Sequence, residues 1–183
     1  MVSAGLGRCG PCTLHQPPLD RTLAALDYAF PWDGLLQRFK FQQALELRGA
    51  LVERLLPLIN DDLPDLLLAV PVSAQRLRER GYNQSQLLAR ALAKPWRLPC
   101  PDDLLLRVRD GAHQARLPLA ERAGNVRGVF AVEPRRLVEL RGRHVAIVDD
   151  VMTSGATLYE IARVLRAAGA TRVQAWVIAR TPE

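Results

Sequence analysis

The stretch HVAIVDDVMTSGAT, residues 144–157, decides the fold that the sequence predicts. Val145 to Val148 are apolar without alternation, which is typical of a strand covered on both faces in a parallel sheet. The apolar positions from Leu158 to Leu165 then predict a helix with one apolar face. A buried strand followed directly by a helix indicates an α/β fold, in which ligands bind beyond the C-terminal ends of the strands.

An acidic pair and a turn of small residues lie between this strand and this helix. Asp149 and Asp150 end the strand, and the turn consists of Thr153, Ser154, Gly155, Ala156 and Thr157. Backbone N–H groups, hydroxyls and the helix dipole can bind a phosphate there, and Gly155 lets the backbone approach closely. The carboxylates would repel a bare phosphate, so the ligand should offer hydroxyl donors or a metal. A phosphorylated sugar meets both demands.

Two common phosphate-binding motifs fit this stretch less well. A Walker loop ends in Lys followed by Ser or Thr, but no Lys follows Lys94. A dinucleotide fingerprint needs several glycines over the turn, and only Gly155 is present. A strand end or a helix cap accounts for each feature alone, but not for the complete ordered string.

Residues 148–157 resemble the signature of type I phosphoribosyltransferases, which bind 5-phosphoribosyl-1-pyrophosphate (PRPP). The resemblance implies a mainly parallel sheet flanked by helices, with a small N-terminal hood over the active site. It implies that the 153–157 turn binds the 5′-phosphate and that the catalytic pair Asp149 and Asp150 faces the ribose hydroxyls. Mg²⁺ is the implied cofactor, held through the substrate rather than by protein ligands.

A second apolar run, Leu66 to Val70, predicts another buried strand, and an arginine-rich segment follows it. Arginine pairs with phosphate through its planar fork of donors. In the resembling family, the loop after this strand holds the pyrophosphate, so Ser73, Arg76 and Arg80 are candidates. A solvated basic face is the alternative interpretation.

Two further segments follow the arginines. Residues 81–84, GYNQ, predict a turn that shapes the loop, and residues 86–93 predict a helix that packs on the sheet without a chemical role.

Residues 107–130 are basic, contain glycines and a proline, and lack sustained periodicity, which is typical of a flexible loop. The family closes such a loop over the bound diphosphate and thereby excludes water. The candidate residues are Arg107, Gln114, Arg122 and Asn125. Hydrogen bonds that fix the loop to the body are the alternative role for the last two. The spacing of the candidate residues in this segment, together with residues 81–84, resembles one branch of the family. This is the ComF or GntX-like branch, which is linked to competence and DNA utilisation.

The resemblance also predicts the domain organisation. Residues 1–19 correspond to the remnant of an N-terminal zinc module, and residues 20–183 to the phosphoribosyltransferase domain, with a hood over about 20–60 and a core over about 61–183. Lys40 in the hood could contact substrate, but a side chain that lies along a helix surface is the favoured interpretation.

Cys9 and Cys12 form half of a zinc-binding motif, and tetrahedral zinc needs four ligands. In the ComF branch they match the second pair of a four-cysteine module whose first pair is missing here. Either the start of the gene lies further upstream or the metal has been lost, so we expect no zinc on this chain unless the module is completed elsewhere. A redox dithiol would need a preceding strand and a thioredoxin pattern, and neither is present.

The composition fits an anionic ligand. Lysine and arginine number 25 against 19 acidic residues, which leaves a net charge of +6. A positive field suits a polyphosphate and could attract nucleic acid, but aromatic residues make up 5% of the chain and do not alternate with basic ones as in stacking platforms. No apolar run approaches membrane-spanning length and no signal peptide opens the chain, so we expect a cytoplasmic protein without a membrane partner.

The sequence therefore predicts a phosphoribosyltransferase that binds PRPP or a related nucleotide. It would transfer phosphoribosyl to or from a nitrogenous base, with pyrophosphate as the leaving group. The alternative is a non-catalytic module that binds a phosphoribosyl compound, a nucleotide or single-stranded DNA, with competence proteins as further partners. The acceptor base and the oligomeric state are not encoded in any motif that we recognise.

Overall fold

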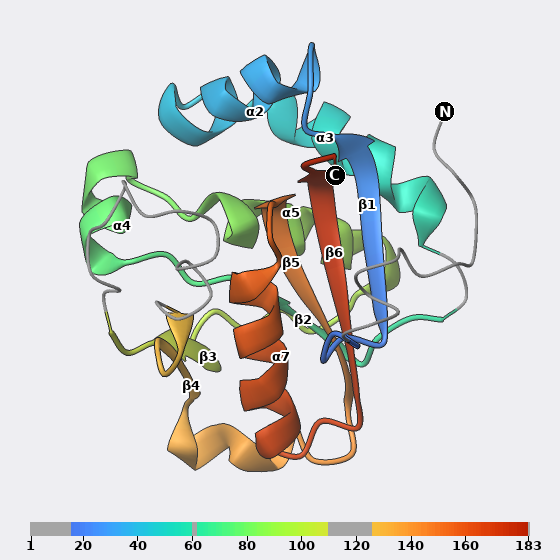
Figure 1. Ribbon diagram of the computed structural model, residues 1–183, viewed down its shortest axis with the longest axis vertical. Helices are drawn as coiled ribbons and strands as arrows, with labels where there is room; N and C mark the ends of the chain where they lie inside the picture. Colours follow the sequence, from blue (N-terminus) through green and yellow to red (C-terminus); the bar gives the residue numbers. More distant parts are fainter. Residues whose placement is uncertain (1–15, 60–61, 110–125, 183) are drawn as a thin grey trace.

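Four parallel strands form the main sheet of the computed structural model, which describes residues 16–59, 62–109 and 126–182 (Figure 1). Their order in the sheet is β1-β6-β5-β2. Their bounds are β1 Arg21–Asp27, β2 Leu66–Ala69, β5 His144–Met152 and β6 Arg172–Arg180. The two apolar runs expected to form strands pair with each other, from Leu66 beside Val145 to Ala69 beside Val148. The predicted α/β fold with a mainly parallel sheet is confirmed.

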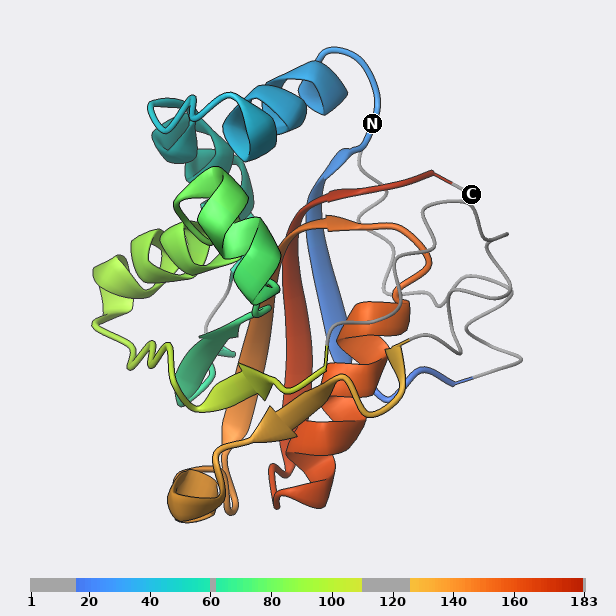
Figure 2. The same cartoon turned by 90° about the vertical axis from the view of Figure 1, so that its left-hand side faces the viewer.

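Helices cover both faces of this sheet, as continuous apolar strands require. On one face, α7 (Ala156–Ala167) packs Ile161 and Leu165 against Val145 and Ile147 of β5. On the other face, the covering residues come from α2 (Trp32–Phe41), α3 (Leu47–Leu55) and α5 (Gln84–Ala93). Figure 2 shows α5 and α7 on opposite sides of the sheet. Each large apolar side chain buried in this way contributes roughly 1.5 to 3 kcal/mol.

A small antiparallel pair of strands lies beside α7. It joins β3 (Leu105–Arg107) to β4 (Phe130–Val132), with Arg107 opposite Phe130. The predicted loop over residues 107–130 is therefore wrong at both ends, because its first and last residues pair with each other in strands. Two short 3₁₀ helices, η2 (Lys94–Trp96) and η4 (Pro134–Glu139), complete this part of the chain.

The N-terminal helices are α2, α3 and the 3₁₀ helix η1 (Leu56–Leu58). Of these, α2 lies above the C-terminal ends of β5 and β6 (Figure 1). Strand β1 falls within the range 20–60 expected for the hood, yet it pairs in parallel with β6 and is an edge strand of the main sheet. The helical part of the hood thus begins at Trp32.

Helix α4 (Ala74–Arg80) follows β2 and lies at the same edge of the sheet as the hood (Figure 1). The C-terminal ends of the strands are therefore bordered by α2, α4 and the start of α7. Among the helices in the described ranges, none is long and apolar enough to cross a membrane.

Candidate active site

The acidic pair lies at the C-terminal edge of the main sheet, as the sequence predicts. Strand β5 continues through both residues to Met152, so that Asp149 is still paired with Val177 of β6. Asp150 is buried, with 2% of its surface exposed, whereas Asp149 is half-buried. The strand thus holds one carboxylate inside the protein and presents the other at the edge.

Each carboxylate has a side-chain partner from a different helix. The Lys40 Nζ atom of α2 lies 2.9 Å from Asp150 Oδ2. The Ser85 hydroxyl of α5 donates a hydrogen bond to Asp149 Oδ1 at 2.8 Å. The favoured interpretation of Lys40 as a surface side chain is wrong, because its ammonium group forms an ion pair with a buried carboxylate.

The surroundings of Asp149 disfavour its charge. Removal from solvent, and next the neighbouring Asp150 carboxylate, raise the pKa of Asp149 to about 7. The hydrogen bond from Ser85 and the charge of Lys40 act in the opposite direction but do not compensate. The acidic pair therefore carries less than two full negative charges near neutral pH.

The turn at residues 153–157 forms a small cavity beside the acidic pair. Its volume is about 50 Å³, and all five residues of the turn line it together with Asp149. Gly155 has φ +77°, and a Cβ atom there would lie 2.6 Å from Met152 Cε and 2.7 Å from Tyr159 Cζ. Glycine is favoured here, because an L side chain would be strained in this conformation and would displace the side-chain ends of Met152 and Tyr159. Helix α7 begins directly after it, so its N-terminal dipole points at the cavity.

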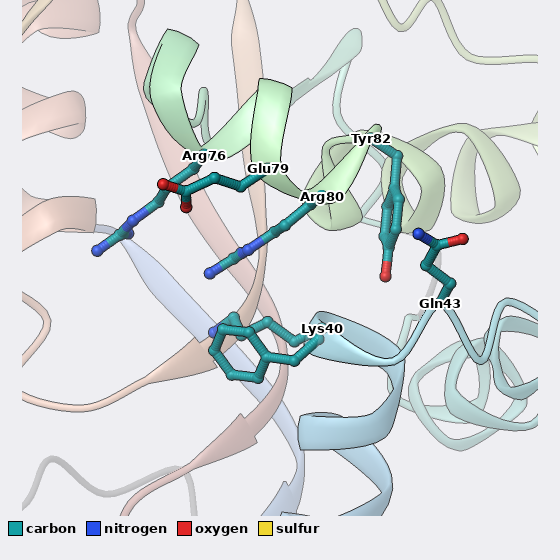
Figure 3. A pocket seen from close by; sticks show the side chains of 7 residues that line it. Lys40, Gln43, Arg76, Glu79, Arg80 and Tyr82 are labelled. Atoms are coloured by element: carbon teal, nitrogen blue, oxygen red, sulfur yellow. The ribbon is translucent and has the colours of Figure 1, made fainter.

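A larger, cationic cavity of about 350 Å³ lies between the hood and α4 (Figure 3). It is lined by Lys40, Phe41, Gln43, Arg76, Glu79, Arg80 and Tyr82. The structure thus brings together the predicted pair Arg76 and Arg80, and Figure 3 shows both guanidinium groups and Lys40 extending into the same space. We name this cavity the cationic pocket.

Two of the predicted phosphate-binding residues have further structural roles. Ser73 caps α4, where its Oγ accepts a hydrogen bond from the Arg76 N–H at 3.2 Å. The Arg80 guanidinium lies over the Phe41 ring, 4.7 Å from its centroid, and donates to Gln84 Oε1 at 3.1 Å. Burial, and next the charge of Arg76, lower the pKa of Arg80. A phosphate group in the pocket would relieve this repulsion between the two arginines.

The segment 81–85 connects these parts. Gly81 ends α4 with φ +80°, and the Tyr82 hydroxyl donates to the Phe39 carbonyl of the hood. Asn83 donates from Nδ2 to the Val70 carbonyl at 3.0 Å, while its Oδ1 caps α5. The predicted turn is confirmed for residues 81–83, whereas its last residue, Gln84, already belongs to α5. The predicted helix begins earlier, at Gln84, and contrary to the prediction its first turn contributes to the site through Ser85.

Of the remaining predicted site residues, only Arg107 lies within the described ranges. Arg107 lies in β3, with its guanidinium over the Phe130 ring at 5.6 Å from the centroid, rather than in a loop. Gln114, Arg122 and Asn125 lie outside the described residues, as do Cys9 and Cys12. Within ranges 16–59, 62–109 and 126–182, no three His, Cys, Asp or Glu side chains gather into a group that could hold a metal.

Comparisons with known proteins agree with this geometry. A family model described as the phosphoribosyl transferase domain matches residues 107–183. The chain is 35% identical over 180 residues to the DNA utilization protein YhgH of Escherichia coli K12, covering 94% of this chain and 78% of that protein. It is 33% identical over 179 residues to competence protein F of Haemophilus influenzae, with the same shares covered.

Two more distant similarities extend this result. Competence protein ComFC of Bacillus subtilis is 30% identical over 150 residues, which cover 80% of this chain and 58% of that protein. Among solved structures, glutamine phosphoribosylpyrophosphate amidotransferase from B. subtilis, complexed with ADP and GMP, superposes with a TM-score of 0.52. The match covers 78% of this chain and 30% of that one at 21% identity, and it supports the fold alone.

Proposed function

Because this chain belongs to the ComF-like branch of the type I phosphoribosyltransferases, we propose that it binds PRPP with Mg²⁺ at the C-terminal edge of its sheet. We further propose that it transfers the phosphoribosyl group to or from a nitrogenous base. One observation carries the proposal: a phosphate-sized turn and a cationic pocket border the same acidic pair. A sugar with phosphate at one end and diphosphate at the other matches this arrangement.

Each part of the ligand has a chemically suited partner. The 5′-phosphate fits the 153–157 turn, where backbone N–H groups and hydroxyls converge at the start of α7. The ribose hydroxyls donate to Asp149 and Asp150, and these hydrogen bonds favour the charged form of Asp149. The diphosphate extends into the cationic pocket, toward Arg76 and Arg80.

The proposed chemistry needs charge stabilisation rather than a protein nucleophile. The C1–O bond to the diphosphate breaks with its electron pair on the departing oxygen, and a nitrogen lone pair forms the new bond to C1. The acidic pair offsets positive charge that develops on the ribose, and the arginines stabilise the diphosphate as it leaves. Mg²⁺ would be held through the substrate rather than by protein ligands, and it would offset the negative charge of the diphosphate as it leaves. Two carboxylates that already have protein partners fit an ion carried by the substrate better than a resident metal.

The test is calorimetry of the purified chain with PRPP and Mg²⁺, compared with ribose 5-phosphate, followed by pyrophosphate release with a panel of bases. We expect PRPP to bind more tightly than ribose 5-phosphate, because only PRPP reaches the cationic pocket. Equal affinities for the two sugars would contradict the assignment of the cationic pocket to the diphosphate. If PRPP binds but no base causes pyrophosphate release, the chain is a binding protein rather than an enzyme.

A second candidate function is the binding of single-stranded DNA, and one observation favours it. Phe41, which lines the cationic pocket beside Arg80, is 64% exposed, so an aromatic ring does accompany basic side chains there. Base stacking on such rings is tolerant of sequence. The names of the relatives, DNA utilization protein and competence protein, agree with it. A salt-dependent shift assay with single-stranded DNA and Phe41→Ala tests it; unchanged affinity of the variant would contradict it.

A further inference from the structure

Lys40 occupies a position between the two halves of the proposed site. Its Nζ lies 2.9 Å from Asp150 Oδ2, and its side chain also lines the cationic pocket with Arg76 and Arg80 (Figure 3). It belongs to the last turn of α2, which is part of the hood and not of the phosphate-binding motifs. A quarter of its side chain is exposed, on a stem that is flexible enough to turn between two partners.

The ion pair between Lys40 and Asp150 is needed only while no ligand is bound to Asp150. Asp150 is buried, and a buried carboxylate without a partner is costly, so Lys40 balances its charge in the free protein. Ribose hydroxyls that donate to the acidic pair would supply the missing hydrogen bonds instead. They would release the Lys40 ammonium group at the moment when diphosphate oxygens enter the pocket beside it.

We propose that Lys40 is a further substrate-binding and catalytic cation, which exchanges Asp150 for the diphosphate when PRPP binds. This inference rests on the proposed function. As the C1–O bond breaks and its electron pair moves to the diphosphate, Lys40 keeps its proton and stabilises the added negative charge together with Arg76 and Arg80. The hood thereby contributes to the departure of the leaving group.

The surrounding charges are consistent with this role. The one carboxylate that lines the pocket among the described residues, Glu79, accepts a hydrogen bond from Gln75 Nε2 at 2.7 Å along α4. With Lys40 freed, three cations would face the diphosphate against this single anion. The alternative role is a fixed tether, in which Lys40 holds the hood to β5 and never contacts a ligand.

Calorimetry with inorganic pyrophosphate and Mg²⁺, and separately with PRPP and Mg²⁺, distinguishes the two roles. Lys40→Met removes the charge and keeps most of the stem, and we expect it to weaken both ligands roughly 10- to 100-fold, as for the loss of one charge-assisted hydrogen bond. Arg38→Met is the matched control, because Arg38 lies exposed on the same helix and does not line the pocket. The affinity of Arg38→Met for pyrophosphate and for PRPP should stay within about twofold of that of the wild type.

A second pair of variants covers the case in which Lys40→Met does not fold, since it leaves Asp150 unpaired. Asp150→Asn frees Lys40 without removing it, so we expect pyrophosphate to bind several-fold more tightly. The double variant Lys40→Met/Asp150→Asn should lose that gain and bind more weakly than wild type. Circular dichroism and thermal melts identify which variants are folded.

The outcomes separate this inference from the proposed function. If wild type binds PRPP but Lys40→Met, when folded, keeps wild-type affinity, Lys40 is a tether and the inference is wrong. Equal pyrophosphate affinity of Asp150→Asn and the double variant would also show that Lys40 is only a tether. If wild type binds neither ligand, the proposed function fails and this inference fails with it.

Discussion

At the N-terminal ends of the strands, the carboxylate of Asp62 receives two hydrogen bonds from Arg172 at 2.6 Å each and one from Gln174 at 2.9 Å. At the C-terminal ends, Asp149 receives one side-chain hydrogen bond and lies next to a second carboxylate. The hydrogen bonds from Arg172 lower the pKa of Asp62, whereas burial and Asp150 raise the pKa of Asp149. The carboxylate at the N-terminal ends of the strands is therefore fully paired, whereas the two carboxylates at the C-terminal ends share one cation, Lys40.

This difference indicates where the fold is stabilised and where it can bind ligands. The network at the first edge continues into the core, because the Trp176 indole N–H donates to Gln174 at 3.0 Å. The polar groups of this network already have hydrogen-bond partners within the protein, so a ligand would add little favourable interaction there. At the second edge a ligand with hydroxyl donors and phosphates would improve the electrostatics, as expected for a binding site. Matched substitutions at the two edges test that contrast.

The largest expected effect is that of Asp150→Asn on turnover. We expect kcat for pyrophosphate release to fall roughly 100- to 1000-fold, because one of two charges opposite the reacting sugar is lost. The fold should persist, since an amide keeps the shape of the side chain. Asp62→Asn is the control at the opposite edge, and it should reduce the melting temperature while kcat is retained. Unchanged turnover in purified Asp150→Asn would overturn the catalytic assignment.

The next effect concerns the pH dependence of stability. The raised pKa of Asp149, about 7, means that the folded state holds a proton that the unfolded state releases near the ordinary pKa of 3.8. The stability linked to this proton is complete below that ordinary value and is lost as the pH rises to about 7, by at most about 1.4 kcal/mol per pH unit. Asp149→Asn should therefore flatten the decline in unfolding free energy between about pH 5 and pH 7, measured by urea denaturation.

Asp62→Asn is again the control at the opposite edge. The lowered pKa of Asp62 means that its stabilisation is present above its ordinary pKa and is lost only when the pH falls through the folded value. Its substitution should therefore leave the slope between about pH 5 and pH 7 unchanged. Equal slopes for wild type and Asp149→Asn would show that Asp149 is ionised throughout this range.

A third prediction compares two glycines with positive φ at the two edges. Gly155→Ala should cost roughly 1 to 2 kcal/mol for the left-handed conformation and more for the contacts with Met152 and Tyr159. Gly142 has φ +72° with nothing within 4 Å of the position that a methyl group would take, so Gly142→Ala should show the conformational cost alone. Only Gly155→Ala should weaken the binding of ribose 5-phosphate by calorimetry. Equal effects of both substitutions on binding would contradict the 5′-phosphate assignment.

Those parts of the site that are contiguous in sequence could be predicted. The strand, acidic pair, turn and helix from His144 to Leu165 form one uninterrupted pattern, and the structure arranges them as expected. The arginines of α4 could be predicted for the same reason, because they follow directly after a recognisable strand. Periodicity and local turn chemistry are sufficient wherever neighbours in sequence are neighbours in space.

The partners of the acidic pair could not be predicted in this way. Ser85 is separated from Asp149 by 64 positions, and Lys40 lies on a hood helix without a motif. Their positions depend on how α5 and α2 pack on the sheet, which no local pattern determines. One weak signal exists, since Asn83 is a favourable N-cap and places Ser85 in the first turn of a helix. The strand at Arg107 escapes prediction because three residues are too few for a periodic pattern.

The smallest expected effect is that of Ser85→Ala. The substitution removes the hydroxyl that donates to Asp149. Because Ser85 is 1% exposed, no water molecule from solvent can take the place of this hydroxyl. We expect a loss of about 1 kcal/mol in stability and a further rise in the pKa of Asp149, because the hydrogen bond favours the charged form. The rise of kcat/KM with pH should then shift to higher pH. Thr171→Val, which removes a hydroxyl that donates to the Gly142 carbonyl at the opposite edge, should reduce stability without moving that profile. A pH profile that stays in place in Ser85→Ala would show that Asp149 does not control the step being measured.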